Sequence, residues 1–450
     1  MEIQQGQFYL FSKRRFLPFF ITQFLGALND NLFKNALLVI VVTTAVANAD
    51  SKTNFTTNLA AGLFILPFFL FSTLAGHLAD KYDKAFIIRR IKFAEVILML
   101  AGCFALWRGD INLMLGILFL LGVQSAFFGP IKYAIIPQHL ATGELVAGNA
   151  QVGMGTFVSI LLGTLVGGWL VTGPQGPIMV GALTISMALC GWYSSCKIPD
   201  APPEKMAETP SGLFNPLRET VQNFRLAKQN PIVLTCIMAA SWFWFYGSCF
   251  LTQVPNFAVT ILQGHPTLIS ILLGAFIIGV AMGSLLCHRL SNGKVEPGLV
   301  PLATLGLSLV SLDLYFSSTA YVFSNQLSQP LAPMAFLMMP EGLRVLAGIL
   351  FIGLFGGLFI VPLYSMIQQG TKAESRARVL SVNNICNALF MVISSLIGIL
   401  LLSILGWSIP QFFLAIALLN LLFMGTVFYY QPIFISAFKG WIKILRVRKS

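Results

Sequence analysis

The first long apolar run of the chain carries polar side chains whose helical spacing could do chemistry. On a helix, Gln23, Asp30 and Lys34 fall at i, i+7 and i+11 and form one stripe, with Asn31 and Asn35 on an adjacent stripe. Asp30 and Lys34 are four residues apart and can form an ion pair. Two interpretations stay open: the pair only fixes helix packing, or it binds a ligand that has one cationic and one anionic centre.

A further cation lies in the fourth apolar run. Lys132, which precedes Tyr133, could bind an anionic group of the same ligand, or its long stem could carry the ammonium to water at the helix end. In the third run, Glu95 follows Arg89 and Lys92. We expect this carboxylate to stabilise the end of its own helix.

The second half of the chain offers mainly neutral polar and aromatic candidates. Such groups suit the hydroxyls and the apolar part of an amphipathic ligand, and they are equally common as helix-packing groups. The binding candidates from this half are Tyr364, Asn383 and Asn387. Asp313 has no obvious partner in the sequence, so it is either a coupling or ligand-binding residue or a hydrated residue at a helix end.

Residues for covalent or metal chemistry are not arranged for it. A lipid acyltransferase would need a His, four residues and then an Asp, whereas His139 is followed at that distance by Glu144. The cysteines show no metal-type spacing, and no glycine-rich phosphate loop with a Lys is present. We therefore expect no enzyme activity, no cofactor and no metal.

The composition indicates a membrane protein. Of the 450 residues, 56% are hydrophobic and only 10% are charged, whereas soluble domains have about 25% charged residues. So few charges cannot cover a water-facing surface, which excludes a soluble enzyme, a disordered regulator and a nucleic-acid binder. The net charge of +12 follows from the Lys/Arg bias of cytoplasmic loops.

The apolar runs predict an all-α membrane protein with twelve transmembrane helices in two six-helix bundles. A span needs about 20 apolar residues. Such runs fall near 16–45, 58–79, 90–107, 111–136, 147–170, 178–196, 232–257, 266–289, 298–320, 344–368, 379–404 and 408–430. The predicted domains are an N-terminal bundle (1–196), a cytoplasmic linker (197–231) and a C-terminal bundle with a basic tail (232–450).

The Lys and Arg residues predict the orientation. With both termini in the cytoplasm, the inside segments hold 24 of the 28 Lys and Arg residues and the outside segments hold 3. The two halves also resemble each other, because Gly129–Tyr133 matches Ile360–Tyr364 and Leu145–Asn149 matches Val379–Asn383 at an offset of about 232 residues. A duplicated six-span unit is typical of transporters.

The segment after the second run carries a family signature. Gly76, three residues, Asp80 and then Lys81 resemble the signature loop of the major facilitator superfamily, although Asp83 stands where that family usually has Gly. The resemblance implies that Asp80 forms a gate. It would accept hydrogen bonds from a helix N-terminus or pair with an arginine of the other half. The gating candidates are Asp80, Lys81, Arg376 and Arg378.

Within that superfamily the chain resembles the bacterial lysophospholipid transporter family. The resembling residues include Gln23–Ala27, Asp30, Asn31, Pro130–Ile135, Gly143–Val146, Asn149, Gly356, Gly357, Val361–Leu363, Gln368, Arg376, Val379, Ser381, Asn383 and Asn387. The resemblance implies a monomeric flippase of the bacterial inner membrane. It would move lysophospholipids such as 2-acyl-glycerophosphoethanolamine among the membrane lipids by alternating access, and an acyltransferase inside the cell would reacylate them.

In this interpretation the binding residues are those that suit the charges of the lysophospholipid headgroup. Asp30 binds the ethanolamine ammonium, Lys34 or Lys132 binds the phosphate, and Gln23 and Asn31 lie beside them. One alternative is a proton-coupled exporter of amphipathic drugs or siderophores. Two others are a membrane lipid enzyme, disfavoured by the missing catalytic residues, and a sensor or scaffold, favoured only by the long linker.

Overall fold

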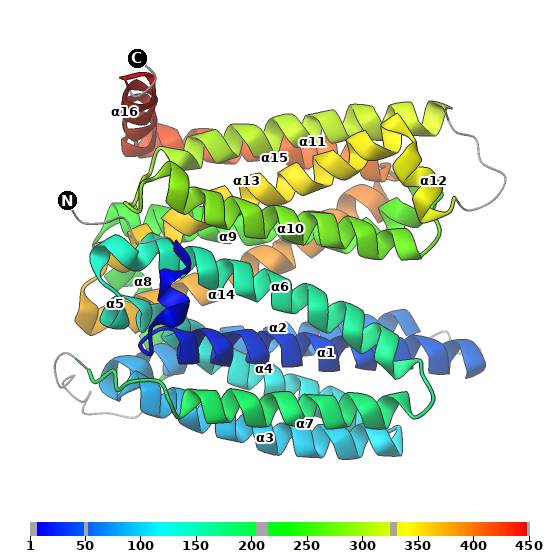
Figure 1. The fold of residues 1–450 in the computed structure, drawn as a ribbon, viewed down its shortest axis with the longest axis horizontal. Coiled ribbons are helices and arrows are strands. Elements are labelled where there is room, and N and C mark those ends of the chain that lie inside the picture. The colour runs from blue at the N-terminus through cyan, green and yellow to red at the C-terminus, as the bar shows by residue number, and fades with distance from the viewer. Residues whose placement is uncertain (1–6, 49–52, 204–214, 325–330, 448–450) are drawn as a thin grey trace. The chain divides into compact units, whose positions relative to one another are not determined.

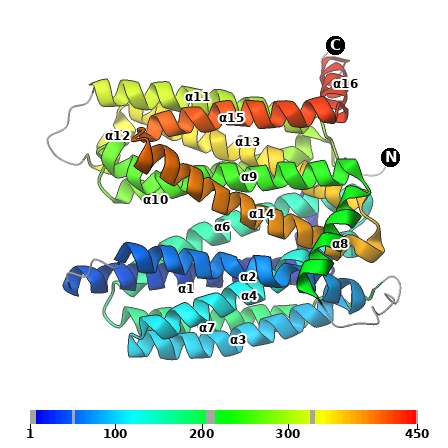
Figure 2. The same ribbon diagram turned by 180° about the vertical axis from the view of Figure 1, so that it is seen from behind.

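The computed structural model describes residues 7–48, 53–203, 215–324 and 331–447, and within these ranges the chain is almost entirely helical (Figures 1 and 2). The longer helices are α1 (Leu17–Asn48), α2 (Thr53–Lys81), α3 (Lys84–Arg108), α4 (Ile111–Ala134), α6 (Leu145–Val171), α7 (Gly176–Ser195), α9 (Pro231–Asn256), α10 (Thr267–Leu290), α11 (Leu299–Ser324), α13 (Pro340–Gly370), α14 (Arg376–Gly398) and α15 (Ile409–Tyr430). Shorter helices are η1 (Gln7–Ser12), α5 (Ile136–His139), η2 (Thr142–Glu144), α8 (Pro216–Lys228), η3 (Phe257–Ile261), α12 (Pro333–Met338), η4 (Ala373–Ser375), η5 (Ile399–Ile404) and α16 (Ile433–Val447).

The chain divides into two compact units. The first comprises Met1–Gly148, Gly155–Pro231 and Gln368–Ala388, and the second comprises Asn149–Met154, Ile232–Ile367 and Leu389–Ser450. A short piece of α6 therefore groups with the second unit, and the first half of α14 groups with the first. The predicted domain boundaries stay a prediction.

The first unit holds the polar residues of the first apolar run. Its closest helix pairs are α2 with α4, α3 with α7 and α1 with α7, and its apolar core includes Leu32, Phe33 and Met99, none of which is exposed. Helix α6 approaches α1 closely because Gly163 faces its backbone, where a Cβ would lie 2.5 Å from the carbonyl oxygen of Leu28. Small residues allow such approaches between membrane helices.

The second unit is held by a buried polar contact among three helices. Asn420 of α15 accepts a hydrogen bond from Trp242 Nε1 of α9 at 2.8 Å and donates to Ser308 Oγ of α11 at 2.8 Å. Asn420 Nδ2 also donates a hydrogen bond to the carbonyl oxygen of Thr304 at 3.2 Å. Because every polar atom in a lipid environment needs a partner, this one amide fixes the register of three helices.

Eleven helices in the described part of the chain are long and apolar enough to cross a membrane, one fewer than the twelve spans predicted. The remaining long helix is α3, whose Lys92 and Glu95 reduce its apolar character, yet both side chains are buried. The exposed side chains of α3 include Phe93, Ile97 and Phe104. These exposed residues follow a helical stripe, so α3 presents an apolar face to lipid and its charges to the protein interior.

Three short helices lie where the sequence pattern predicts connections. The predicted linker contains α8, which begins after Asn215, whose side chain accepts hydrogen bonds from the backbone N–H groups of Leu217 and Arg218. The segment between the predicted runs 298–320 and 344–368 contains α12, and its residues 325–330 lie outside the described residues. The predicted basic tail forms α16. A search for long apolar runs misses helices of this length and polarity.

Candidate functional site

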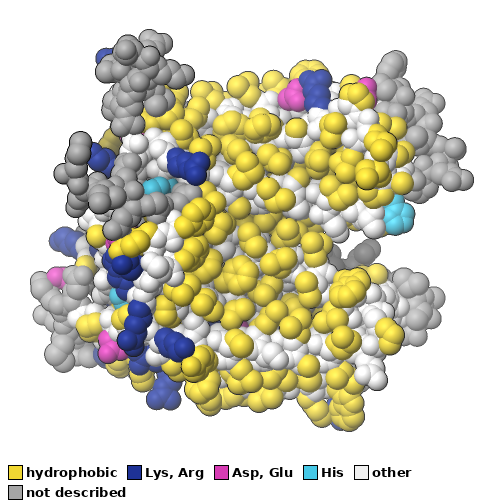
Figure 3. Space-filling model, viewed as in Figure 1, with side chains coloured by type: hydrophobic (Ala, Val, Ile, Leu, Met, Phe, Trp, Pro, Cys, Tyr) yellow, Lys and Arg dark blue, Asp and Glu magenta, His cyan; other side chains and the backbone are white. Residues whose placement is uncertain are grey.

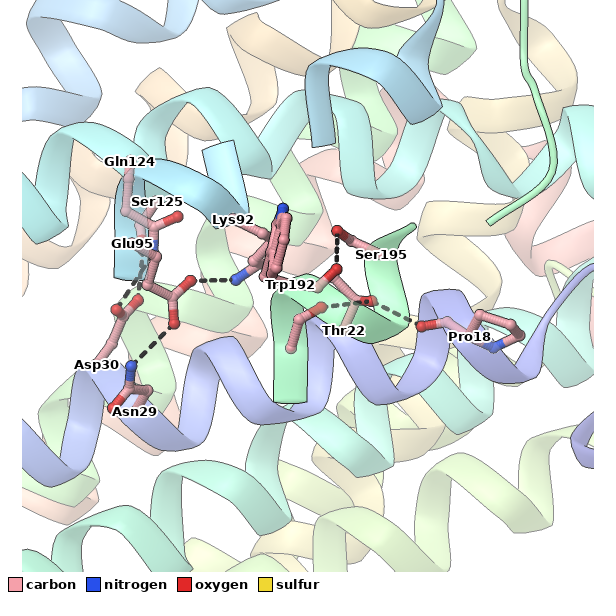
Figure 4. A network of polar contacts seen from close by, with 11 residues as sticks. Pro18, Thr22, Asn29, Asp30, Lys92, Glu95, Gln124, Ser125, Trp192 and Ser195 are labelled. Carbon is pink, nitrogen blue, oxygen red and sulfur yellow. Dashed lines mark hydrogen bonds and ion pairs between the residues drawn. The ribbon is translucent and has the colours of Figure 1, made fainter. Parts of the chain in front are cut away.

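The buried carboxylate of Asp30 faces α4 rather than its own helix (Figure 4). It accepts hydrogen bonds from Ser125 Oγ at 2.5 Å and from Gln124 Nε2 at 3.3 Å, and only 6% of Asp30 is exposed. Both donors are neutral, and no cation of the described residues lies within ion-pair distance of Asp30. The site therefore holds a buried carboxylate that has hydrogen-bond partners but no counter-charge in contact.

The predicted ion pair between Asp30 and Lys34 is wrong. Lys34 Nζ instead donates to Asn31 Oδ1 at 3.0 Å and lies 5.5 Å from the ring centroid of Phe64 on α2. A separation of four residues allows such a pair on an isolated helix, but partners from neighbouring helices decide the rotamers here. The two charges remain on one helix face without contact.

The ion pair next to Asp30 comes from α3. Lys92 Nζ and Glu95 Oε2 are 2.6 Å apart, and both side chains are at most 2% exposed. Asn29 Nδ2 donates to the other oxygen of Glu95 at 2.9 Å (Figure 4). Glu95 therefore binds α1 to α3 inside the bundle, whereas we expected it to stabilise a helix end, and Arg89 pairs with Asp200 instead.

The sequence indicated only some of the contacts among Lys92, Glu95 and Asn29. Lys92 and Glu95 are three residues apart in an apolar run, a spacing that permits a pair on one helix face. Nothing in the spacing indicates that Asn29 of another helix completes the contact. Breaking a buried pair of this kind leaves an unpaired charge, which is strongly destabilising, so its first role is structural.

Lys132 is the second candidate charge of the first unit. Its Nζ donates to Thr156 Oγ1 of α6 at 2.7 Å, and Thr156 Oγ1 in turn donates to Gln23 Oε1 of α1 at 3.1 Å. Only 9% of Lys132 is exposed, and no carboxylate of the described residues pairs with it. The ammonium therefore lies among the helices. The alternative interpretation, in which the long stem of Lys132 carries the ammonium to water, is wrong.

The two charges occupy matched positions along α1 and α4. Asp30 contacts Ser125, and two turns away Gln23 is linked through Thr156 to Lys132. The pairs Gln23/Asp30 and Ser125/Lys132 are each seven residues apart, which corresponds to about 10 Å along a helix. The first unit thus separates a carboxylate from an ammonium by about 10 Å along the helix axis.

The other binding candidates are divided between the two units. Tyr364 Oη accepts a hydrogen bond from Trp244 Nε1 at 3.3 Å in the second unit. Asn383 and Asn387 are buried on the part of α14 that belongs to the first unit. Asn31, which donates to the carbonyl oxygen of Ala27 at 2.8 Å, is the partner of Lys34. The binding roles of these four residues remain predictions.

Asp80 contacts the start of α14, within the first unit. Its carboxylate accepts hydrogen bonds from the backbone N–H groups of Ala377 at 3.0 Å and Arg378 at 3.1 Å, and from Arg378 Nε at 3.3 Å. Gly76 permits this approach, because a Cβ there would lie 2.8 Å from the carbonyl oxygen of Ala377. A carboxylate at a helix N-terminus is stabilised by the peptide dipoles.

The sequence thus anticipated both kinds of partner for Asp80. The other gating candidates differ: Lys81 Nζ lies 5.5 Å from the ring centroid of Tyr82, and Arg376 donates to the carbonyl oxygen of Thr371 at 3.4 Å. Asp83 has its own function, because it caps α3 through the N–H of Phe86 at 2.7 Å. Its other oxygen accepts a hydrogen bond from the backbone N–H of Ala201 at 2.7 Å, so the carboxylate at the usual glycine position ties α3 to the segment after α7.

Asp313, which had no partner in sequence, forms a two-bond ion pair with Arg344. Arg344 Nε donates to Asp313 Oδ2 at 3.2 Å, and Arg344 Nη2 donates to the other oxygen. The side chains are 43% and 55% exposed. This partner came from a residue 31 positions away on another helix, and the pair makes Asp313 a poor candidate for an unpaired coupling group.

The amino-acid sequence of the chain is similar to that of known membrane transporters. The family profile of the Major Facilitator Superfamily matches residues 19–339. The chain is 24% identical over 377 residues to the lysophospholipid transporter LplT of Escherichia coli (strain SE11), covering 81% of this chain and 83% of that protein. It is also 24% identical over 373 residues to the transporter of the same name from Shigella boydii serotype 4 (strain Sb227), with the same coverage.

Solved structures show the same fold. The human organic anion transporter MFSD10 superposes with a TM-score of 0.69 at 14% identity, covering 95% of this chain and 99% of that one. The fucose:proton symporter FucP of E. coli superposes with a TM-score of 0.66 at 14% identity, covering 94% and 98%. The chain therefore belongs to the major facilitator superfamily, and it is a multi-pass membrane transporter, not an enzyme.

Proposed function

We propose that this transporter is a flippase for lysophospholipids such as 2-acyl-glycerophosphoethanolamine. It moves them by alternating access across the bacterial inner membrane, as a monomer, and supplies an acyltransferase that acts inside the cell. The names of its relatives support the substrate class. The observation that carries the proposal is the buried carboxylate of Asp30, which contacts no cation in the part of the chain that the structure describes and lies two helical turns from the buried ammonium of Lys132.

The spacing of the two charges fits a phosphoethanolamine headgroup. A charge-assisted hydrogen bond of about 2.8 Å at each end leaves about 5 Å of the 10 Å between the two positions along α1. The four bonds from the phosphorus to the nitrogen of phosphoethanolamine, each about 1.5 Å, span about that length. Asp30 would bind the ammonium and Lys132 the phosphate.

The direction of the site favours Lys132 over Lys34 as the phosphate ligand. Lys34 lies one turn beyond Asp30 on the side away from Gln23, whereas Lys132 is joined to Gln23 through Thr156. A headgroup that extends from Asp30 towards Gln23 therefore reaches Lys132. The lipid tail needs no polar path, because it stays in an apolar environment throughout the movement.

The separation of the charges also distinguishes the proposed substrate from a cationic drug. An exporter of cations needs a carboxylate but no buried ammonium nearby, since like charges repel the ligand. Uptake of labelled lysophospholipids into spheroplasts that contain the transporter, measured beside a panel of cationic drugs, tests the proposal. Lysophospholipid uptake without drug transport supports it, and drug efflux without lysophospholipid uptake contradicts it.

We expect both termini in the cytoplasm, because 24 of the 28 Lys and Arg residues fall on that side in the predicted topology. A reporter active only in the periplasm should be inactive after Ser450 and active in the connection between α11 and α12. Activity at the first position and none at the second would contradict the orientation. Equal expression of the two fusions is the control.

The contact between Asp80 and α14 is proposed to act as the gate, with Arg378 as its charged partner and Lys81 and Arg376 beside it. Asp80→Asn removes the charge that faces the helix N-terminus and Arg378, a change of about 1–2 kcal/mol. We expect an about tenfold shift towards conformations in which the contact is open, with slower transport at normal expression.

Maleimide labelling of Ser381→Cys in a background without native cysteines measures this shift, because Ser381 is buried beside Gly76 in the contact. Labelling should accelerate about tenfold in Asp80→Asn. Asp83→Asn is the matched control, since this neighbouring carboxylate caps α3. Equal labelling rates with unchanged transport would show that Asp80 is not part of a gate.

A further inference from the structure

A basic pocket lies at one end of the first unit, apart from the proposed headgroup site. It has a volume of about 610 Å³, and its lining includes Lys13, Arg14, Arg15, Arg89, Lys197 and Asp200. In Figure 3, Lys and Arg side chains gather at this end, where α1 begins and α7 ends. Arg15 lies before α1, and Asp30 lies 13 residues after Leu17, the first residue of α1, which is about 20 Å along the helix.

Two of the five cations are neutralised by the protein itself. Arg15 Nη2 lies 2.6 Å from Glu144 Oε1, and Arg89 Nη2 lies 2.7 Å from Asp200 Oδ1. Arg89 Nε is buried and has no hydrogen-bond partner among the described residues. The guanidinium of Arg89 therefore keeps a donor that a ligand could use.

The other three cations have no carboxylate partner in the described part of the chain. Lys13 Nζ lies 4.0 Å from the ring centroid of Tyr9, and Lys197 Nζ lies 4.2 Å from that of Tyr193. The aromatic rings orient the two ammonium groups without neutralising them. With Arg14, they leave three positive charges around one pocket, which suits a phosphate group.

The walls of the pocket continue as lipid-facing surface. Helices α3 and α7 pack against each other, and both expose apolar side chains towards their pocket ends. Phe93 on α3 is 46% exposed, and Leu189 and Tyr193 on α7 are 45% and 62% exposed. A phosphate bound in the pocket could therefore carry acyl chains that lie along these two helices, which a free phosphate does not need.

We propose that this pocket binds the phosphodiester headgroup of an anionic phospholipid, which is not the transported substrate. Basic pockets at the cytoplasmic ends of membrane helices bind such headgroups, and this end is the one that the Lys and Arg distribution assigns to the cytoplasm. The bound lipid contacts the segment before α1, the start of α3 and the segment after α7. It thereby ties three parts of the first unit together at the membrane surface.

The experiment measures lipid binding to the full-length purified transporter by native mass spectrometry and by thermal unfolding in detergent. The probes are phosphatidylglycerol, phosphatidylcholine and inorganic phosphate. The test variant is the triple substitution Lys13→Gln, Arg14→Gln and Lys197→Gln. The matched control removes three exposed cations of α8: Arg218→Gln, Arg225→Gln and Lys228→Gln.

Phosphatidylglycerol should bind and stabilise the wild type, whereas phosphatidylcholine and inorganic phosphate should not. The test variant should bind phosphatidylglycerol about a hundredfold more weakly, and the control variant should bind it like the wild type. Equal binding of phosphatidylglycerol and phosphatidylcholine would overturn the proposal. Equal losses in the two triple variants, or equal stabilisation by inorganic phosphate, would also overturn it. None of these readouts depends on transport, so the proposed function is tested separately.

Discussion

Replacing Asp30 by alanine should nearly abolish uptake of lysophosphatidylethanolamine and leave uptake of an anionic lysolipid, lysophosphatidylglycerol, largely intact. Among the described residues, the hydrogen-bond donors to this carboxylate are the neutral groups of Ser125 and Gln124, so its charge is available to an ammonium. A charge-assisted hydrogen bond contributes about 1.5–3 kcal/mol, which corresponds to an about 10- to 100-fold loss. Asp30→Asn should fall between the wild type and Asp30→Ala.

The measurement is the initial rate of uptake of each labelled lysolipid into spheroplasts, normalised to the amount of inserted protein. Asp313→Asn is the matched control, because it alters another carboxylate of a long apolar helix that is paired with Arg344 and half exposed. Its uptake rates should equal those of the wild type. Unchanged lysophosphatidylethanolamine uptake by correctly inserted Asp30→Ala would mean that Asp30 is structural.

Replacing Lys132 by alanine should reduce uptake of both lysolipids, because phosphate is common to them. The ammonium is buried and donates to the hydroxyl of Thr156, and no carboxylate of the described residues pairs with it, so the phosphate would be its anionic partner. We expect an about 10- to 100-fold loss for either substrate. The change should therefore lower the rates without altering headgroup preference, unlike Asp30→Ala.

Lys34→Ala is the comparison for Lys132→Ala, since it removes another cation of the same bundle, which is half-buried and donates to Asn31. Its effect should be severalfold at most, since the headgroup extends from Asp30 in the opposite direction. A larger loss in Lys34→Ala than in Lys132→Ala would assign the phosphate to Lys34. A loss restricted to lysophosphatidylethanolamine in Lys132→Ala would contradict a phosphate-binding role.

The helices were predicted from apolar runs, and the partners of Asp80 from the resemblance to a family signature. The apolar runs correspond to long helices, and the segment from Gly76 to Lys81 correctly indicated that Asp80 binds a helix N-terminus and an arginine. Gly76 and Asp80 are four residues apart on one helix face, so a single segment carries both the close approach and the charge. The contact itself joins α2 to α14, and it could be predicted only because this segment resembles a family signature.

Features that depend on contacts between helices could not be predicted in this way. Asp30 and Lys34 are correctly spaced for a pair, yet Ser125 of α4 and Asn31 take their places as partners. Helices that are apolar nearly all round give no indication of which face is buried. The link from Lys132 through Thr156 to Gln23 joins three helices, and no spacing within one helix encodes it.

Transbilayer movement of labelled lysophosphatidylethanolamine in proteoliposomes that contain the purified transporter tests whether this protein is a lysophospholipid flippase. We expect faster movement than in protein-free liposomes, and movement at the protein-free rate when Asp30→Ala and Lys132→Ala are combined. Correct insertion is verified by protease protection. Wild-type proteoliposomes that move the lipid no faster than protein-free liposomes, or a double variant that moves it as fast as the wild type, would contradict the account.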